Sequence, residues 1–320
     1  MKFEHLFSPM QVGKVTYRNR IVSAPMAFGL IVQNPDARDF TYRKLEASAK
    51  GGNGCVIVGE TDVNFVDAVR IPGFRPFDFA KPEEDMETFQ AVGEYARRIK
   101  RHGAVALAEL VHCGKEKVPF GPNEEAIGPI ETTNLAGVRV RPMNEDDMAR
   151  IARDFAVSAT YMQKAGFDGV LIHGGHGFLF TQFLSPLMNT RTDSYGGSLE
   201  NRARFPLQIL KAVREAVGPD FLVELRIDGT DHQPGGITPE ETGAFVAMAE
   251  PYITSVHVTC GIYEESVKSG TESSMFHPHG LNIDNAAIIK TYTKLPVGAV
   301  GGINSPELCE QAIAEEIGRA

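Results

Sequence analysis

The sequence has 320 residues, with 32 Lys and Arg against 41 Asp and Glu, which gives a formal net charge of −9. Nucleic acids and anionic membranes attract basic surfaces, so this acidic balance disfavours both as the main partner. Hydrophobic residues make up 42% of the chain and charged residues 23%, as in ordinary globular proteins. The composition therefore excludes a chain that is disordered throughout.

The sequence shows no targeting or membrane segment. Charged residues interrupt the first twenty positions, where a signal peptide has an apolar run, and no stretch approaches the roughly 20 apolar residues of a membrane helix. The cysteines form no CxxC pair, so we expect buried thiols in a reducing compartment. They are Cys55, Cys113, Cys260 and Cys309. We expect a cytoplasmic protein.

Seven short apolar runs, most of them bounded by Gly or Pro, predict β-strands. Each is too short for a helix, and its nearly continuous apolar character is typical of a strand that is covered on both faces. These runs span residues 21–24, 55–58, 105–110, 169–172, 221–227, 255–259 and 297–300.

Amphipathic segments rich in Ala, Glu and Arg separate the later runs and predict helices. Several begin with a capping signal, such as Asn144, Thr238-Pro239 and Ser305-Pro306. Gly166 and Gly218 end two of them. The predicted helices span residues 85–101, 145–165, 199–217, 239–249 and 306–317.

Strands that alternate with helices, without a linker, leave two α/β folds. A doubly wound sheet usually has a Gly-rich turn after its first strand, whereas here the first strand leads into Ala24-Pro25-Met26. The spacing favours a TIM (β/α)8 barrel formed by a single domain over residues 1–320. Only seven strands are evident before the chain reaches residue 320.

Active sites of such barrels lie at the carboxyl ends of the strands. His173 and His176 directly follow the fourth predicted strand, where two imidazoles can hold a substrate oxygen that gains negative charge. A metal site is the second interpretation, although no third ligand is evident at suitable spacing. The remaining interpretation is a pair of polar residues that cap a loop.

Two further strand ends carry candidate binding residues. Arg226 ends the fifth strand, where a cation is costly unless it meets an anion or a polarised ring; a structural ion pair with Glu224 or with an acid of a neighbouring strand is the alternative. Gly301 and Gly302 follow the seventh strand, and their amides are placed to bind a phosphate. A loop as long as residues 174–198 is usually functional. Asn201, Arg202 and Arg204 are instead expected to tie this loop to the following helix.

The sequence resembles the Old Yellow Enzyme family of FMN-dependent oxidoreductases. The resemblance covers nearly the whole chain. It is carried by LFSPMQVGKVTYRNRIVSAPM, GGNGCVIVGET, AELVHCGKE, VELRID and above all GFDGVLIHGGHGFLFTQFLSPLMNTRTDSYGGSLENRARFP. Within the family, the chain looks most like the branch of 2,4-dienoyl-CoA reductase, trimethylamine dehydrogenase, and the 2-enoate and bile-acid reductases.

The resemblance implies a set of FMN-binding residues and a pair of substrate-binding imidazoles. Arg226 matches the arginine beside the N1/C2=O edge of the flavin, and His173 and His176 match the pair that holds the substrate carbonyl. The residues matching the flavin contacts are Ser23, Ala24, Pro25, Met26, Gly59, Glu60, Glu109 and Arg226. Gly301 and Gly302 are expected to bind the phosphate of the cofactor from their position after the seventh strand. No metal site is implied.

The chain departs from the family pattern at two site positions. Glu109 stands where many members have Gln; as a carboxylate it would accept a bond from flavin N3–H but could not donate to C2=O, which would lower the potential of the flavin. Phe178 replaces the usual proton-donating Tyr, so we expect Tyr263 to supply the proton. Tyr263 packing over the ring as a rim aromatic is the alternative. Phe28 and Phe178 are expected to contact the substrate.

A third departure concerns the end of the sequence. Family members continue with an eighth strand whose Gly-Arg binds the FMN phosphate, and long members add a 4Fe-4S cluster and FAD- and nucleotide-binding domains. These segments are not in the given sequence, so we expect the chain alone to retain FMN weakly.

The resemblance implies an ene-reductase that takes electrons from NADH or NADPH and delivers hydride from flavin N5 to the C=C of an unsaturated carbonyl or enoate. One alternative is a flavin-dependent amine dehydrogenase, although the chain has no Trp for a cage around a cationic amine. The other is a catalytically inactive barrel subunit. The only partner expected is the small-molecule substrate, and oligomerisation is left open.

Overall fold

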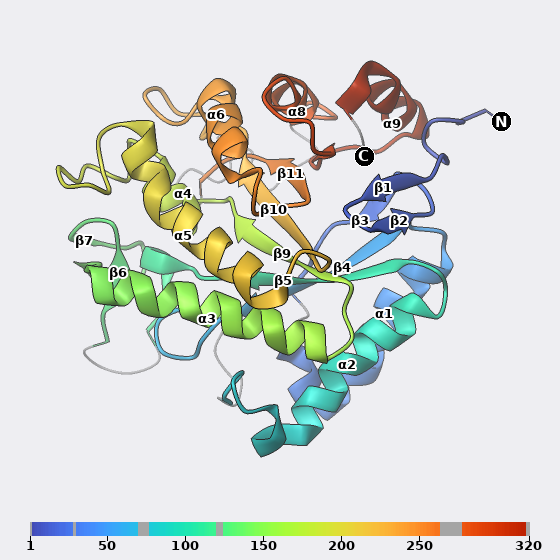
Figure 1. Cartoon of the computed structure of the whole chain (residues 1–320), viewed down its shortest axis with the longest axis horizontal. Coiled ribbons are helices and arrows are strands. Elements are labelled where there is room, and N and C mark those ends of the chain that lie inside the picture. The colour runs from blue at the N-terminus through green and yellow to red at the C-terminus, as the bar shows by residue number, and fades with distance from the viewer. Residues whose placement is uncertain (1, 28–29, 70–76, 120–123, 263–276, 318–320) are drawn as a thin grey trace.

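The protein is described by a computed structural model that covers residues 2–27, 30–69, 77–119, 124–262 and 277–317. Its centre is a seven-stranded parallel sheet in which the spatial order of the strands equals their order in the chain. The strands are β3 (Val22–Ser23), β4 (Cys55–Asp62), β5 (Val105–Val111), β9 (Gly169–Gly174), β10 (Leu222–Asp228), β11 (Ser255–Thr259) and β12 (Val297–Ala299). All seven coincide with the predicted apolar runs, and the sheet curls into a half-barrel of the TIM-barrel type (Figure 1).

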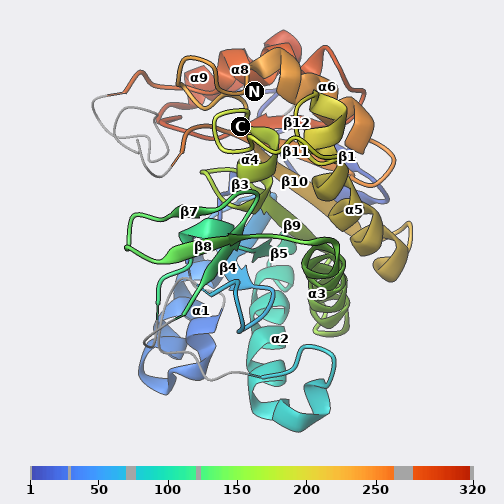
Figure 2. The same cartoon turned by 90° about the vertical axis from the view of Figure 1, so that its left-hand side faces the viewer.

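Helices connect the successive strands and form the outer layer of the molecule (Figures 1 and 2). Four of the predicted helices are found within a residue of the expected bounds, and the fifth continues as a π-helical turn, Ile313–Ile317. Among the described residues, α1, α8 and the short helix α4 (Leu179–Leu184) were not predicted. The helices between strands are α1 (Pro35–Lys50), α2 (Met86–Lys100), α3 (Glu145–Lys164), α5 (Leu199–Val217), α6 (Pro239–Ala249) and α8 (Ile283–Lys290), and α9 (Pro306–Ala312) follows β12.

The helix starts follow from local capping chemistry. The Asn144 side chain accepts a bond from Asp147 N–H while the Asp147 carboxylate accepts one from Asn144 N–H, which forms a capping box at the start of α3. Ser198, Thr238 and Ser305 likewise cap α5, α6 and α9 with their hydroxyl groups. Side-chain caps satisfy amide groups that have no partner inside the helix.

The amino-terminal end of the barrel is filled by an antiparallel hairpin, β1 (Met10–Val12) and β2 (Val15–Tyr17). Val12 and Tyr17 are fully buried against Ile57, Leu107 and Leu171, which project from the strands into the barrel. The Tyr17 hydroxyl donates to the buried Glu224 carboxylate at 2.7 Å. This packing closes one end of the barrel and leaves the site to the carboxyl ends of the strands.

An insertion between β5 and α3 forms a small second sheet beside the barrel (Figure 2). Its strands are β6 (Ala126–Gly128), β7 (Thr132–Thr133) and β8 (Arg139–Pro142). Arg141 ties β8 to α3 through two hydrogen bonds to Asp147, at 2.7 and 3.0 Å. These strands are too short to show the two-residue period of a half-buried strand, so they were not predicted.

The edge strands β3 and β12 face each other across a seam in the half-barrel. Glu310, just beyond the middle of α9, bridges the seam: its carboxylate accepts bonds from the N–H groups of His5 and Leu6 at 2.9 and 2.8 Å. The first residues of the chain are thereby joined to the last helix. Among the described residues, no helix is long and apolar enough to cross a membrane.

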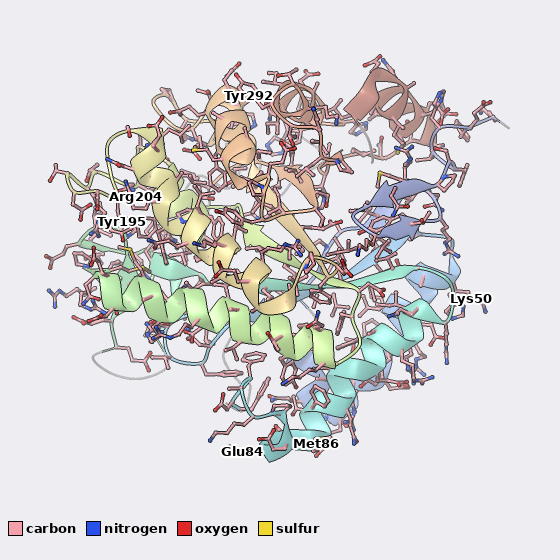
Figure 3. All side chains as sticks on the ribbon, in the orientation of Figure 1. Lys50, Glu84, Met86, Tyr195, Arg204 and Tyr292 are labelled. Atoms are coloured by element: carbon pink, nitrogen blue, oxygen red, sulfur yellow. The ribbon has the colours of Figure 1, made fainter. Side chains whose placement is uncertain are left out.

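The long loop after β9 contains the short helix α4 (Leu179–Leu184). Arg202 and Arg204 tie the loop to α5, which is the structural role that the sequence predicted for them. Arg202 is buried and donates to the carbonyl oxygens of Leu184 and Gly197 and to the Glu241 carboxylate. Arg204, labelled in Figure 3, donates to Ser194 O at 2.8 Å. These arginine side chains thus donate hydrogen bonds to backbone carbonyl groups of the loop.

Candidate active site

The parallel strands bring most of the predicted site residues to one edge of the sheet. In the register of the sheet, Arg226 on β10 is paired with His173 on β9 and with His257 on β11. A further bridge pairs Ala27, just after the Ser23–Met26 segment, with Gly59 on β4. Tyr263 and Phe28 lie outside the described residues. The parallel register thus brings His173 and Arg226 side by side, and the functional roles of the predicted residues stay predictions.

His173 and His176 form a perpendicular pair of rings with centroids 5.0 Å apart. His173 is buried, and its Nδ1 accepts a bond from Gly175 N–H at 3.3 Å. In the neutral imidazole this places the proton on Nε2. The backbone therefore fixes Nε2 as the donor atom of a neutral His173.

Contacts to the backbone and the ring hold His176 in place. Its backbone has a left-handed φ of 62°, which a residue other than glycine rarely adopts, and its N–H donates to Asp228 Oδ1 at 2.9 Å. Its Nε2 lies 2.8 Å from Thr259 Oγ1 and 3.5 Å from Arg226 Nη2. Strain of this kind persists only where surrounding contacts enforce it.

Phe178 packs beneath the imidazole pair. Its ring meets His173 edge to face at 5.2 Å, and it also contacts Val111 and Cys113. The side chain is 2% exposed. Phe178 therefore fixes the position of His173, whereas a direct substrate contact stays a prediction.

Glu109 and Arg226 form a buried polar corner in the barrel. Glu109 Oε1 and Arg226 Nη1 lie 3.6 Å apart, beyond hydrogen-bond distance. Neither Glu109 Oε1 nor Arg226 Nε has a hydrogen-bond partner within the part of the chain that the structure describes. Glu224, the alternative partner of Arg226, binds Tyr17 instead. Among the described residues, the alternative for Arg226, an ion pair with Glu224 or with an acid of a neighbouring strand, is not found: Glu109 lies on β5, two strands away from β10, and both groups are left incompletely satisfied.

The position of Gly59 shapes the same corner. A Cβ atom at this residue would collide with Glu109 Oε2 and would lie 2.6 Å from Pro25 Cβ. Only glycine allows these three residues to approach so closely.

Burial decides the protonation state of Glu109. It raises the pKa of Glu109 to about 8; nearby Arg226 opposes this shift and Glu60 adds to it. Burial therefore favours the neutral carboxyl near pH 7 over the carboxylate assumed from the sequence. A neutral acid carries one donor and one acceptor, as does the side chain of Gln.

The sequence analysis missed Asp228, which is as deeply buried as Glu109. Its Oδ1 accepts a bond from His176 N–H and its Oδ2 lies 2.7 Å from Thr181 Oγ1. Burial raises the pKa of Asp228 to about 8. A signal was present in the sequence, because a residue two positions after Arg226 on a strand points to the same face. Thr259, the partner of His176, was missed as well.

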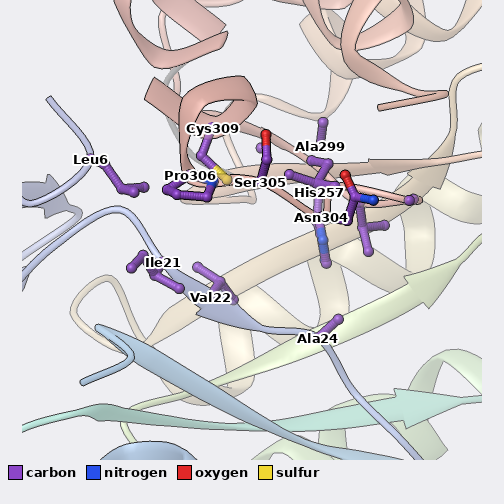
Figure 4. Close-up of a pocket in the computed structure, with 15 residues that line it drawn as sticks. Leu6, Ile21, Val22, Ala24, His257, Ala299, Asn304, Ser305, Pro306 and Cys309 are labelled. Atoms are coloured by element: carbon purple, nitrogen blue, oxygen red, sulfur yellow. The ribbon is translucent and has the colours of Figure 1, made fainter. Parts of the chain in front are cut away.

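A cavity of about 450 Å³ lies along the seam between β3 and the turn after β12 (Figure 4). Ala24, Gly301 and Gly302 line it together with His257 and Asn304. Gly301 and Gly302 have left-handed φ angles of 128° and 60°, which expose backbone at the cavity wall. Ser23, Pro25 and Met26 continue from β3 but do not line this cavity.

These residues fit FMN, the cofactor that the resemblance implies. Glu109 Oε1 and Arg226 Nε are buried polar atoms without a hydrogen-bond partner among the described residues. The edge of a heteroaromatic ring can supply the missing hydrogen bonds. The glycine turn after β12 exposes backbone at the wall of the cavity. Among the described residues, no group of three or more His, Cys, Asp or Glu is arranged to hold a metal ion.

Comparisons with known proteins show the family of the chain. Residues 5–319 match the NADH:flavin oxidoreductase / NADH oxidase family. The chain is 33% identical over 322 residues to an NADH oxidase of Thermoanaerobacter brockii, covering 99% of the chain and 48% of that protein. The chain thus spans about half the length of this curated relative.

Two solved structures share the fold. A complex of 2-naphthoyl-CoA reductase superposes with a TM-score of 0.85 at 25% identity, over 98% of this chain and 49% of the other. Histamine dehydrogenase from Rhizobium sp. 4-9 gives a TM-score of 0.82 at 25% identity, over 99% and 45%. The chain is therefore similar both to a reductase and to an amine dehydrogenase.

Proposed function

The chain belongs to the NADH:flavin oxidoreductase / NADH oxidase family, and from that premise we propose that it is an FMN-dependent ene-reductase. Its substrate is the activated C=C of an α,β-unsaturated carbonyl compound or enoate, and its electrons come from NADH or NADPH. Bound FMN supplies the hydride chemistry. The protein binds and orients the reactants and stabilises the charge that develops on the substrate oxygen.

The observation that carries the proposal is the fixed imidazole pair. His173 presents Nε2–H because its Nδ1 accepts from Gly175 N–H, and His176 is held at the backbone by Asp228 and at the ring by Thr259. Two donors that converge on one carbonyl oxygen polarise the conjugated C=C for attack at its β-carbon. Their orientation is set before substrate binds, so little reorganisation opposes the reaction.

The cofactor contacts are proposed on the geometry of the same mouth. The backbone contacts come from Ser23, Ala24, Pro25 and Met26, together with Gly59 and Glu60. The polar side chains come from Glu109 and Arg226. The amides that bind the phosphate are those of Gly301 and Gly302. The guanidinium of Arg226 stabilises negative charge on the pyrimidine edge of the ring. Phe178 carries no acidic proton, so we assign the proton to Tyr263, and we place Phe28 beside the substrate.

Anaerobic flavin spectroscopy tests the function. The purified protein is saturated with FMN, reduced with NADH or NADPH, and mixed with an enone or a cinnamate-type enoate. We expect the yellow absorption of oxidised flavin to return, and we expect H173A/H176A to bind FMN normally while this reoxidation slows at least about a hundredfold, since two charge-stabilising donors are lost.

Other outcomes identify the alternatives. The similarity to histamine dehydrogenase makes a primary and a tertiary amine the matched test substrates. Bleaching of oxidised flavin by an amine, together with no response of reduced flavin to enones, would make the protein an amine dehydrogenase. Failure to bind FMN at any concentration would make it a binding subunit without flavin chemistry.

A further inference from the structure

The polar corner formed by Glu109 and Arg226 has a defined hydrogen-bonding pattern. Glu109 is 3% exposed on β5, and the Arg226 side chain comes from β10 across the interior of the barrel. The buried Glu109 Oε1 and Arg226 Nε have no protein partner among the described residues. Buried polar atoms in this state are costly unless a ligand completes them.

A carboxylic acid and a guanidinium side by side present an acceptor and two donors. The acid contributes its carbonyl oxygen and its O–H, and Arg226 contributes Nε–H. The complementary ligand edge is an N–H next to two acceptors. The pyrimidine edge of a flavin has this sequence, with N3–H, C2=O and N1 in a row.

We propose that Glu109 is a neutral carboxylic acid in the FMN complex, accepting a bond from N3–H and donating its own proton in a bond to C2=O. The inference rests on the proposed binding of FMN. Glu109 then acts as a proton-dependent control of cofactor affinity, because its ionisation replaces a donor with a negatively charged acceptor that faces the C2=O lone pairs.

The surroundings of Glu109 favour the neutral form. The titratable groups presented to it are Arg226 from β10, Glu60 from β4 and, two residues beyond its register partner Leu171, His173 from β9. Burial is the largest influence and raises the pKa of Glu109 to about 8; Glu60 adds to this and Arg226 opposes it. The 3.6 Å separation from Arg226 is too long to supply the hydrogen bonds that a buried carboxylate needs.

The neutral acid also keeps the charge of Arg226 available. A Glu109 carboxylate would neutralise the guanidinium, whereas an acid leaves a full positive charge at the N1 side of the ring. Negative charge on that edge is then stabilised in a site of low dielectric constant. Glu109 therefore favours reduction below its pKa and opposes it above.

The test is the pH dependence of FMN binding, measured by the quenching of flavin fluorescence in wild type, E109Q and E215Q. Gln has the same shape and the same donor and acceptor but does not ionise. If only the neutral acid binds, the Kd of the wild type rises about tenfold per pH unit above about pH 8. E109Q should stay within about twofold of its value at pH 7. E215Q, a change at an exposed position on α5, should follow the wild type.

An infrared difference spectrum adds a readout that needs no flavin. Wild type minus E109Q should show the carbonyl stretch of a protonated carboxylic acid at pH 6, and this band should vanish above about pH 9. Parallel Kd profiles of wild type and E109Q, or absence of the band, would overturn the inference. If the Kd profiles diverge as expected but enones fail to reoxidise the flavin, the inference stands and the proposed function fails. If neither protein binds FMN, both fail.

Discussion

Replacing Asp228 by Asn tests whether the centre of the site contains a carboxylic acid instead of a carboxylate. Burial raises the pKa of Asp228 from 3.8 to about 8. Between these values the folded protein holds a proton that the unfolded chain has lost. The free energy of unfolding therefore falls as the pH rises, by about 1.4 kcal/mol per pH unit for this group, and the contribution is fully lost above about pH 8.

The Asn side chain is compatible with the site. Its amide oxygen can keep the bond from His176 N–H, and its NH₂ can donate to Thr181 Oγ1. The Thr181 hydroxyl then donates to Gly174 O, which already lies 3.2 Å away. D228N thus reproduces the hydrogen bonds of the protonated acid without the titration.

Urea unfolding of the protein without flavin, at several values between about pH 5.5 and pH 7, measures the effect. We expect the slope of unfolding free energy against pH to be more positive in D228N than in wild type by about 1.4 kcal/mol per pH unit. V66A, which truncates an exposed apolar side chain, should keep the wild-type slope. Equal slopes in D228N and wild type would refute a protonated Asp228. Proton uptake during refolding of the wild type near pH 6.5 gives the same answer if D228N does not fold.

Three further substitutions test packing and polarity. G59A should lower the free energy of unfolding in urea by about 1–3 kcal/mol, because its Cβ would lie 2.6 Å from Pro25 Cβ. It should also weaken FMN binding. An unchanged free energy of unfolding together with an unchanged Kd for FMN would contradict the close approach. T259V removes the hydroxyl 2.8 Å from His176 Nε2 and should lower kcat/KM for an enone about fivefold, an effect of about 1 kcal/mol, whereas T259S should restore it. Y161F removes a buried hydroxyl without a partner among the described residues and should leave unfolding unchanged or raise its free energy by up to about 1 kcal/mol; a clear loss of stability would reveal a partner.

The strands and their order could be predicted because apolar runs and glycine or proline boundaries are local properties. The helices α3, α5 and α6 could be predicted for the same reason, since their caps and periods are visible in sequence. Helix α1 has a strongly polar composition and only four buried residues, and α8 has eight residues and two buried ones. Both helices are stabilised mainly by packing against the barrel. The spacing of apolar residues in the sequence does not reveal this packing.

The candidate site divides in the same way. His173, His176 and Arg226 were predicted because they follow apolar strands, and parallel strands end at one edge. Asp228 and Thr259 were missed, although both occupy strand ends. Their roles depend on their hydrogen bonds to His176. Those bonds form because the backbone of His176 is left-handed, which the sequence pattern did not indicate.

The sequence by itself determined the α/β class, the positions of the strands and the polar groups at their carboxyl ends, since these depend on neighbouring residues along the chain. The tertiary structure decided how the hairpin fills the barrel, how Glu310 spans the seam, and that burial raises the pKa of Glu109 and of Asp228. A protonation state depends on how many atoms separate a carboxyl from water and on which charges face it. Residues far apart in the chain supply those atoms and charges, so only the folded arrangement fixes them.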